Sequence, residues 1–346
     1  MKGNGIAALL RRPVVLAPMG GGPSAPALVA AASQAGALGF LAGSYKSAQG
    51  LRADIAELRA MSAEAFGVNL FVPGSPTSDP GAVESYLASL SGDAEALSEG
   101  TGSPSWDDDN FDEKLDVVLQ ERPPVVSFTF GRPASEVMEA LAENGTLVGV
   151  TVTSVTEARE VQGSAADFLC VQGAEAGAHR GSFNNDSTGA TPLLELIAQI
   201  RRTTDLPLIA AGGITGPAMV QAVIAAGATA AQCGTAFLRC PESGATQVHK
   251  DALADPRFTT TAMTRAFSGR PARGLFNRFM QEHPDAPAAY PEINNATRPL
   301  RARAAAIADT ERMSLWAGTG FRAARELPAA EVVELLCAGV RGGTDR

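Results

Sequence analysis

Short apolar runs recur along the first two-thirds of the chain, and most of them are continuous rather than alternating with polar residues. Continuous apolar runs of this length are typical of strands that are buried on both faces of a parallel sheet. We therefore predict eight buried strands, at 14–17, 38–42, 66–71, 125–130, 147–152, 168–171, 208–211 and 230–233.

Segments with helical character separate these runs, at 26–34, 48–59, 135–142, 156–161, 192–202 and 217–226. Several begin at proline or at Ser/Thr and stop before glycine; Pro217, for example, stands at the start of one helix and Gly227 just past its end. Strand and helix thus alternate through eight units. The predicted fold class is α/β, a closed (β/α)₈ TIM barrel.

Two segments fall outside this alternation. Residues 73–124 form a long insertion between strands 3 and 4, with helices predicted around 83–90 and 111–120. We interpret its acidic triplet, Asp107 to Asp109, as a solvated turn without chemistry. Residues 241–346 are predicted to be mostly helical. The expected organisation is a barrel at 1–240, with the insertion between its third and fourth strands, and a helical C-terminal segment at 241–346 that completes the barrel and covers its mouth.

The composition is that of a globular protein, with 45% hydrophobic and 19% charged residues among 346. The net charge of −9 and the absence of a dense Lys/Arg run exclude nucleic acid as an expected partner. No apolar run is long enough to span a membrane, and Met1 to Asn4 leads into a strand rather than the apolar core of a signal peptide. We expect a cytoplasmic protein, either a monomer or a homodimer.

The chain has four cysteines and three histidines. No two cysteines form a C-x-x-C pair, and the histidines lie too far apart in sequence to suggest a metal site. We interpret the cysteines as reduced, packed thiols and predict no metal. These residues are Cys170, Cys233, Cys240, Cys337, His179, His249 and His283.

Glycine-containing turns follow the last two predicted strands, at Gly212-Gly213 and at 232–235, Gln-Cys-Gly-Thr. In many barrels a phosphate binds the backbone N–H groups of these two loops. A tight βα turn also needs glycine, so either turn alone is weak evidence. Together they predict the phosphate site of flavin mononucleotide (FMN).

A loop almost without side chains, Pro18-Met19-Gly20-Gly21-Gly22, follows the first strand. Such a bare backbone can lie flat against a planar ring, which favours a ligand-facing loop. Asn69 is the one polar side chain in the third apolar strand. Its amide must find hydrogen-bond partners, and an internal partner and a flavin ring are equally compatible with the sequence.

The segment from Gln172 to Gly181 follows the sixth strand and contains His179. Gly177 and Gly181 allow an unusual backbone path, so the imidazole can stand close to a bound ring. There it can take a proton or, when protonated, stabilise an anionic substrate. A solvated histidine is an equally good interpretation of the residue alone. Glu175 can either orient His179 or cap a turn.

Motifs spread over nearly the whole chain resemble those of the class I nitronate monooxygenases, formerly called 2-nitropropane dioxygenases. Several motifs in the same order are far more specific than any one of them. The motifs lie at 17–21, 36–39, 43–45, 67–73, 172–181, 211–214, 268–274 and 315–318.

This resemblance implies a barrel that holds non-covalent FMN. It also implies oxidation of alkyl nitronates, such as propionate 3-nitronate, by O₂ to a carbonyl compound and nitrite through a flavin semiquinone. His179 matches the catalytic histidine of the family, and Thr129 and Ser268 are expected to line the substrate pocket. The expected cofactor-binding residues are Pro18, Met19, Gly20, Asn69, Gln172, Gly177, Gly212, Gly213, Gln232, Cys233, Gly234 and Thr235.

The chain departs from the family pattern at three positions. Ala178 stands where a second glycine is common, Thr319 where glutamine is common, and Thr129 where histidine is frequent. Because Thr129 ends the fourth predicted strand at the barrel mouth, its change concerns substrate preference more than flavin binding.

Two other functions remain open on this scaffold. One is an FMN-dependent NAD(P)H:quinone or enoyl-acyl-carrier-protein reductase, and the other is a non-catalytic flavin- or phosphate-binding barrel. The tail that contains Ser268 to Gly274 and Trp316 favours the nitronate enzyme over the reductases.

Overall fold

The computed structural model describes residues 5–61, 65–187 and 189–340. Met1 to Asn4 and residues 341–346 of the predicted tail lie outside the described residues. A short helix, α1 (Gly5–Leu9), stands between the N-terminal residues and the first strand. The expectation that the N-terminus leads directly into a strand is therefore wrong.

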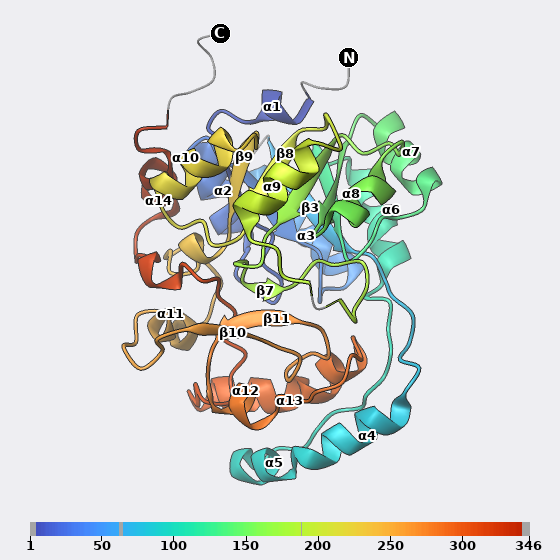
Figure 1. Ribbon diagram of the computed structural model, residues 1–346, viewed down its shortest axis with the longest axis vertical. Helices are drawn as coiled ribbons and strands as arrows, with labels where there is room; N and C mark the ends of the chain where they lie inside the picture. The colour runs from blue at the N-terminus through green and yellow to red at the C-terminus, as the bar shows by residue number, and fades with distance from the viewer. Residues whose placement is uncertain (1–4, 62–64, 188, 341–346) are drawn as a thin grey trace.

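Eight parallel strands close into a barrel in the order β1-β2-β3-β4-β5-β6-β8-β9, which confirms the predicted TIM barrel (Figure 1). The fourth strand ends one residue earlier than predicted, because Phe130 takes a left-handed backbone with φ of 77°. The strands are β1 (Val14–Leu16), β2 (Leu38–Ala42), β3 (Phe66–Phe71), β4 (Val125–Thr129), β5 (Leu147–Val152), β6 (Phe168–Gln172), β8 (Leu208–Ala211) and β9 (Ala230–Cys233).

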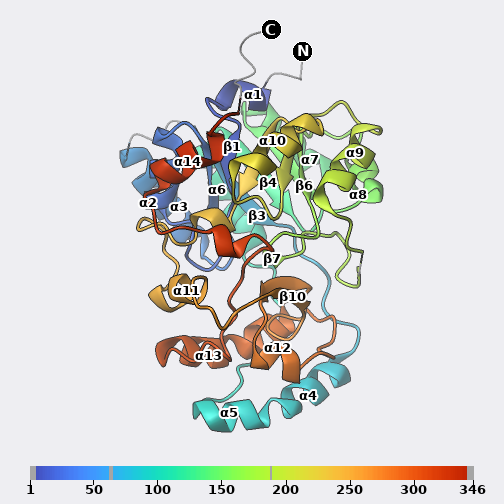
Figure 2. The ribbon, with the colours of Figure 1, turned by 60° about the vertical axis from the view of Figure 1, so that its left-hand side comes forward.

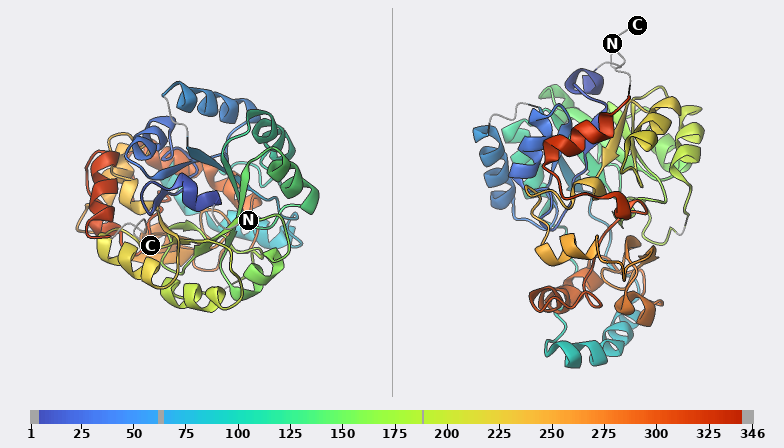
Figure 3. Two further views of the ribbon diagram at one scale, coloured as in Figure 1. Left: turned by 90° about the horizontal axis from the view of Figure 1, so that it is seen from above. Right: turned by 90° about the vertical axis from the view of Figure 1, so that its left-hand side faces the viewer.

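A ring of helices surrounds the barrel, as the view along its axis in Figure 3 shows. The last helix of the chain belongs to this ring, because α14 packs against α2 and α10. The ring consists of α2 (Pro26–Gln34), α3 (Ala48–Ala60), α6 (Phe111–Glu121), α7 (Ser135–Glu143), α8 (Val155–Val161), α9 (Leu193–Arg201), α10 (Pro217–Ala225) and α14 (Ala329–Cys337).

Large side chains fill the barrel interior where glycine leaves room for them. A Cβ on Gly67 would overlap the ring of Phe40, and a Cβ on Gly149 would overlap the ring of Phe168. Phe40 and Phe168 are both 2% exposed and belong to one interior cluster with Ile6 of α1. The N-terminal end of the barrel is thus packed, and the opposite end is left for a site.

A second layer lies below the barrel in Figure 1 and is seen from another side in Figure 2. It contains helices from both the insertion and the C-terminal segment, and these share one apolar core. The C-terminal segment also contains strands, which the mostly helical prediction missed because they are short and partly polar. The layer consists of α4 (Pro80–Ser89), α5 (Ser91–Leu97), α11 (Gln247–Ala252), β10 (Thr261–Thr264), β11 (Ala272–Leu275), α12 (Arg278–Glu282) and α13 (Glu292–Ala306).

The strand β7 (Ala178–His179) connects the two layers. It comes from the loop after β6 and pairs antiparallel with β11, so that His179 is opposite Ala272. Two short 3₁₀ helices, η1 (Thr235–Phe237) and η2 (Phe321–Ala323), complete the described elements. No helix among the described residues is long and apolar enough to cross a membrane. All four cysteines are free thiols.

Candidate active site

A cavity of about 550 Å³ lies between the carboxyl ends of the barrel strands and the second layer. Its volume is in the range of pockets that bind small molecules and cofactors. Most of the site residues expected from the sequence line it: Pro18, Met19, Gly20, Asn69, Thr129, Gln172, Gly177, His179, Gly212, Gly213, Gln232, Gly234 and Thr235.

Two of the expected residues do not line this cavity. Cys233 is 1% exposed and belongs to the core between the barrel and its helices. Ser268 is also 1% exposed and lies behind His179, where it contacts the imidazole. Ser268 therefore contacts a cavity-lining residue and does not line the cavity itself.

Asn69 is bound to the neighbouring strand. Its Nδ2 donates to Ser127 Oγ at 2.9 Å and to Thr129 Oγ1 at 3.0 Å. Thr129 Oγ1 lies in turn 3.2 Å from Thr151 Oγ1. The internal partner expected for Asn69 is thus present, and three adjacent strands present a connected row of polar groups to the cavity.

Gln172 holds the loop that carries His179. Its Nε2 donates to the carbonyl oxygen of His179 at 3.0 Å, and its Oε1 accepts the N–H of Gly181 at 2.8 Å. The same loop is bound from the other side, because Arg180 N donates to Pro271 O at 2.8 Å. His179 is therefore fixed by the end of β6 and by the second layer together.

The imidazole of His179 lies in an aromatic enclosure. Its ring centroid is 5.4 Å from that of Tyr290, 5.7 Å from that of Trp316 and 5.9 Å from that of Phe130. Its Nε2 is 2.9 Å from Ser268 Oγ. This side chain is not the solvated histidine that the sequence left open.

Burial lowers the pKa of His179 to about 3, and the nearby Arg270 and Arg301 act in the same direction. The imidazole is therefore neutral near pH 7. A protonated His179 as the charge that stabilises an anion does not fit this environment. The positive charges that act on the imidazole are those of Arg270 and Arg301.

Arg270 is 5% exposed and stacks on Phe130, with Cζ 3.7 Å from the ring centroid. Its guanidinium donates to the carbonyl oxygens of Arg180 and Ser182. The cation is thus held by a ring face and by backbone dipoles close to the histidine loop.

Glu175 caps a helix and does not orient His179. Both of its carboxylate oxygens accept the N–H of Leu193, at 3.0 and 3.2 Å, at the first residue of α9. A carboxylate at this place satisfies an unpaired N–H and interacts favourably with the helix dipole. The turn-capping alternative is the one that the structure shows.

The turns after β8 and β9 have the backbone that their glycines allow. Gly212 and Gly213 have φ of 125° and 68°. Gly234 leads into η1, and Thr235 Oγ1 accepts the N–H of Gly318 at 3.0 Å. Both turns line the cavity, and they follow neighbouring strands of the barrel.

The bare loop after β1 is held by one buried serine. Ser24 Oγ accepts the N–H of Met19 at 2.8 Å and donates to Ala17 O at 3.0 Å. A Cβ on Gly20 would overlap Ser44 Oγ, so the loop passes close to the neighbouring one. The backbone at Met19 and Gly20 is therefore fixed at the cavity wall.

The acidic triplet is not merely a solvated turn. Asp109 Oδ1 accepts the N–H of Tyr45 at 3.0 Å, and its Oδ2 pairs at 2.8 Å with Lys114, which is 2% exposed. Tyr45 lines the cavity, and its hydroxyl lies 3.1 Å from that of Tyr290. The insertion thus positions a residue of the site.

Sequence reasoning missed several other cavity residues, among them Arg298 and Arg301 of α13 and His249 of α11. His249 Nε2 lies 3.1 Å from the carbonyl oxygen of Trp316, and burial lowers the pKa of His249 to about 4. The spacing of these residues carries no signal, because only the docking of the second layer brings them to the barrel.

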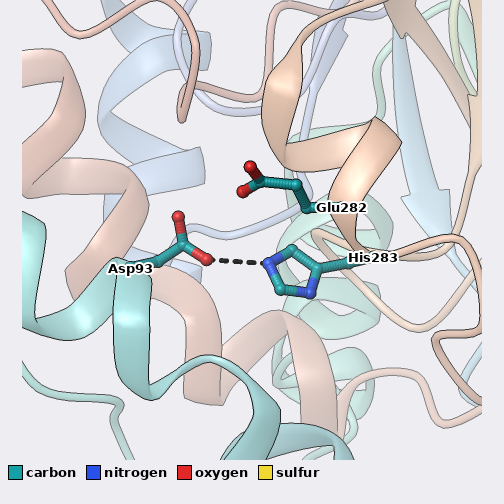
Figure 4. A group of neighbouring side chains, drawn as sticks. All are labelled: Asp93, Glu282 and His283. Atoms are coloured by element: carbon teal, nitrogen blue, oxygen red, sulfur yellow. Dashed lines mark hydrogen bonds and ion pairs between the residues drawn. The ribbon is translucent and has the colours of Figure 1, made fainter.

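One cluster outside the cavity has the composition of a metal site, namely Asp93, Glu282 and His283 (Figure 4). Asp93 Oδ2 is 2.7 Å from His283 Nε2, and Asp93 Oδ1 accepts Arg312 Nε at 2.7 Å. Glu282 pairs with Arg278 at 3.3 Å. Cations of the protein already neutralise these carboxylates, so the cluster joins α5 to α12 and is not a candidate metal centre.

The family model described as nitronate monooxygenase matches residues 5–339. Nitronate monooxygenase of Pseudomonas aeruginosa is 37% identical over 345 residues, which cover 96% of this chain and 97% of that protein.

Two solved structures place the fold among known enzymes. A nitroalkane oxidase from Streptomyces ansochromogenes has a TM-score of 0.93 and 49% identity, over 96% of each chain. FabK from Thermotoga maritima is more distant, with a TM-score of 0.73 and 26% identity over 97% of this chain and 94% of that one.

Proposed function

The chain belongs to the nitronate monooxygenase family of flavoenzymes, and from this premise we propose that its cavity binds FMN and that His179 serves the reacting nitronate. The activity of the family is the oxidation of nitronates. The proposed substrates are alkyl nitronates such as propionate 3-nitronate, and the proposed products are a carbonyl compound and nitrite.

Several features of the cavity fit FMN. The positive-φ turn at Gly212-Gly213 and the turn at Gly234 offer backbone donors to a phosphate at one end. The fixed backbone at Met19 and Gly20 offers a flat wall for a ring system, and Asn69 and Gln172 offer amides at the strand ends. When bound, the flavin supplies the electron transfer between nitronate and O₂.

His179 acts in its neutral form. Because Nε2 faces Ser268, the other ring nitrogen, Nδ1, is the atom that can exchange a proton or a hydrogen bond with substrate. A nitronate needs only to be held and oriented there. A neutral nitroalkane must first lose a proton from carbon, and a neutral imidazole is the form that can accept it.

The enclosure around His179 keeps water from the reacting carbon. Phe130 and Trp316 pack on the imidazole and line the cavity, and Tyr290 closes the enclosure behind them. In such a low-dielectric site the charges of Arg270 and Arg301 act more strongly on an anion than they would in water. The protein thus binds the nitronate anion without a charged histidine.

The observation that carries this proposal is the position of His179, neutral and enclosed, in the cavity that the flavin-type turns also line. The test compares His179→Asn with the wild type for aerobic nitrite release from propionate 3-nitronate, at equal flavin content. We expect a large loss of kcat/KM. Unchanged nitrite release would overturn the role of His179.

The reductase alternative predicts a different response. Under anaerobic conditions NADH would bleach the flavin within seconds, and propionate 3-nitronate would leave the spectrum unchanged. The greater distance of FabK in identity and TM-score favours the nitronate enzyme. We expect bleaching by the nitronate and none by NADH, and HPLC of the released flavin should identify FMN.

A further inference from the structure

Arg270 is a buried residue that binds the chain directly after His179. It is 5% exposed, and its Nε donates to the carbonyl oxygen of Arg180 at 3.3 Å, while its Nη2 donates to the carbonyl oxygen of Ser182. These acceptors belong to the first and the third residue after His179. Arg270 does not line the cavity, so any effect that it has on the reaction passes through its neighbours.

The turn that carries Arg270 also carries the partner of the imidazole. Ser268 Oγ lies 2.9 Å from His179 Nε2 and 3.2 Å from Arg270 O. Gly269, between the two residues, has φ of 73°, and a Cβ there would overlap the carbonyl oxygen of Ala289. The turn is therefore packed in one conformation, in which the Ser268 hydroxyl and the guanidinium both reach the histidine segment.

The ring of Phe130 provides a third connection. Arg270 Cζ lies 3.7 Å from the ring centroid of Phe130, and this centroid lies 5.9 Å from that of the His179 imidazole. The left-handed backbone of Phe130, with φ of 77°, is an outlier for a bulky residue. Strained backbones of this kind persist where their surroundings hold them, often at functional sites. The strained turn after β4 thus presents one ring to both the guanidinium and the imidazole.

The guanidinium of Arg270 is a cation held by neutral groups. Its hydrogen-bond acceptors are two carbonyl oxygens, and no carboxylate forms an ion pair with it in the part of the chain that the structure describes. Burial lowers the pKa of Arg270 to about 10, so the side chain stays charged near pH 7. A buried cation without an anion is costly. The arrangement is explained if the cation serves the neighbouring histidine.

The groups that act on the imidazole come from three places in the second layer. Arg270 lies on the turn before β11, Arg301 on α13, and Tyr290 just before α13, with its ring centroid 5.4 Å from that of His179. Burial raises the pKa of Tyr290 well above its ordinary value of 10.0, so this phenol is neutral near pH 7. Both charges are positive, and a nearby positive charge favours the neutral imidazole.

We propose that Arg270 is a positioning residue for His179, which holds the backbone after the imidazole and keeps a positive charge beside it, so that the ring has one orientation and one neutral form. This inference rests on the proposed function, because it assigns the residue that prepares His179 for its role. Arg270 itself touches neither flavin nor substrate in this scheme.

A double-mutant cycle tests whether Arg270 acts through His179. Arg270→Met removes the charge and both donors but keeps a long side chain on Phe130. We expect kcat/KM for nitrite release from propionate 3-nitronate, at equal flavin content, to fall by about 10-fold, the range of a hydrogen bond to a charged group. In the His179→Asn background the same change should cost less than about 2-fold, because residues that act as a unit are not additive. Equal losses in both backgrounds would overturn the proposal.

Two further variants separate the role of Arg270 from that of a general buried cation. Arg270→Lys keeps the charge but lacks the rigid fork that reaches two carbonyls, so it should recover part of the loss. Arg265→Gln is the matched control, since half-buried Arg265 lies on the same segment and its Nη2 donates to Asn185 O, farther along the loop from His179. It should stay within about 2-fold of the wild type. A loss as large as that of Arg270→Met would overturn the specific role of Arg270.

Nuclear magnetic resonance of the holoenzyme gives a readout that does not depend on turnover. The chain has three histidines, so ¹⁵N-histidine labelling gives three imidazoles, and the spectrum of His179→Asn identifies the signals of His179. At pH 7 the wild type should show two well-separated ¹⁵N shifts for this ring, one for each nitrogen of a fixed tautomer. In Arg270→Met these shifts should move toward each other as tautomers interconvert. Unchanged His179 shifts in Arg270→Met would overturn the proposal.

The outcomes separate this role from the fold and from the proposed function. Urea unfolding shows whether each variant is folded, and if Arg270→Met is not, the His179 shifts of Arg270→Lys decide, with the same convergence expected to a smaller extent. If the wild type releases no nitrite, the proposed function fails and the spectra alone decide on Arg270. Nitrite release by the wild type together with unchanged His179 shifts in the variants would leave the function standing and remove the positioning role.

Discussion

The imidazole of His179 and the hydroxyl of Ser268 lie 2.9 Å apart, although 88 residues separate them in the chain. Ser268 is also close to the backbone of Arg270, since its Oγ lies 3.2 Å from Arg270 O and 3.4 Å from Arg270 N. The second layer of the molecule thus contacts Nε2 of the barrel's histidine, whereas Nδ1 has no hydrogen-bond partner among the described residues.

Ser268→Ala removes the partner of His179 Nε2 and leaves the imidazole free to change its tautomer and rotate. We expect kcat/KM for propionate 3-nitronate to fall by about 5- to 10-fold, the range of one neutral hydrogen bond, with unchanged flavin content. The kcat/KM for a neutral nitroalkane should fall further, because this substrate must first give a proton to His179. Steady-state kinetics with both substrates, together with the flavin absorbance per protein, measure this.

Ser85→Ala is the control for this variant, because Ser85 is exposed on α4 and its hydroxyl bonds only the local backbone, Gly81 O. It should retain wild-type kinetics. Wild-type kinetics in Ser268→Ala would show that the hydrogen bond to His179 has no part in the reaction.

The two buried histidines make stability depend on pH. The ordinary pKa of histidine is 6.5, and burial lowers it to about 3 in His179 and about 4 in His249. Between these values and 6.5 the unfolded chain binds protons that the folded protein does not. Stability should therefore be full above about pH 6.5 and fall as the pH decreases from there.

Urea unfolding at pH 7, 6, 5 and 4.5 measures this dependence. For each protein the change in the free energy of unfolding is measured relative to its own value at pH 7. The double variant His179→Asn/His249→Asn should lose less than the wild type between pH 7 and 4.5, because its unfolded chain lacks two histidines that would bind protons. Equal losses in wild type and variant would mean that other groups determine the acid sensitivity.

The barrel was predictable because its signal is local. Each strand is buried on both faces and so reads as a continuous apolar run, and the helices between them carry proline and glycine at their ends. Asn69, Gln172 and His179 could be found by the same logic, since the ends of parallel strands meet at one edge.

The second layer was not predictable in this way. Tyr45, Tyr290 and Arg301 meet only because α13 and the insertion pack together over the barrel mouth, and no periodicity encodes such a contact. The strand β7 has two residues, too few for a pattern. For Glu175 the sequence left two roles open, and only the position of Leu193 decides between them.

The ion pair between Asp109 and Lys114 ties the insertion to the site. Asp109→Asn should remove the charge partner of Lys114, which is 2% exposed, and weaken the bond to the N–H of Tyr45. We expect a loss of roughly 3 kcal/mol in the free energy of unfolding, because an unpaired charge stays buried. Urea denaturation measures the loss.

A second substitution separates the charge from the local fold. Lys114→Met in the Asp109→Asn background removes the unpaired cation and should recover part of the stability. Asp108→Asn, next to Asp109 but without an ion pair among the described residues, should have little effect. A free energy of unfolding for Asp109→Asn equal to that of the wild type would contradict the structural role of the ion pair between Asp109 and Lys114.

Gly177 is needed for space rather than for its backbone angles. A Cβ at this position would lie 2.5 Å from the carbonyl carbon of Ala317 and from the nitrogen of Gly318, which are backbone atoms that cannot move aside cheaply. Gly177→Ala should therefore push the histidine loop away from the 317–318 segment. We expect a loss of about 1–3 kcal/mol in the free energy of unfolding and a lower flavin content, since Gly177 lines the cavity.

The control for Gly177→Ala is Gly74→Ala, because a Cβ on Gly74 would meet no atom within 4 Å. That variant should keep both its stability and its flavin. Urea denaturation and the flavin-to-protein absorbance ratio measure the two effects separately. An unchanged free energy of unfolding together with an unchanged flavin content in Gly177→Ala would show that the loop and the 317–318 segment can move apart without destabilising the protein. The close approach of these two segments would then have no role in shaping the site.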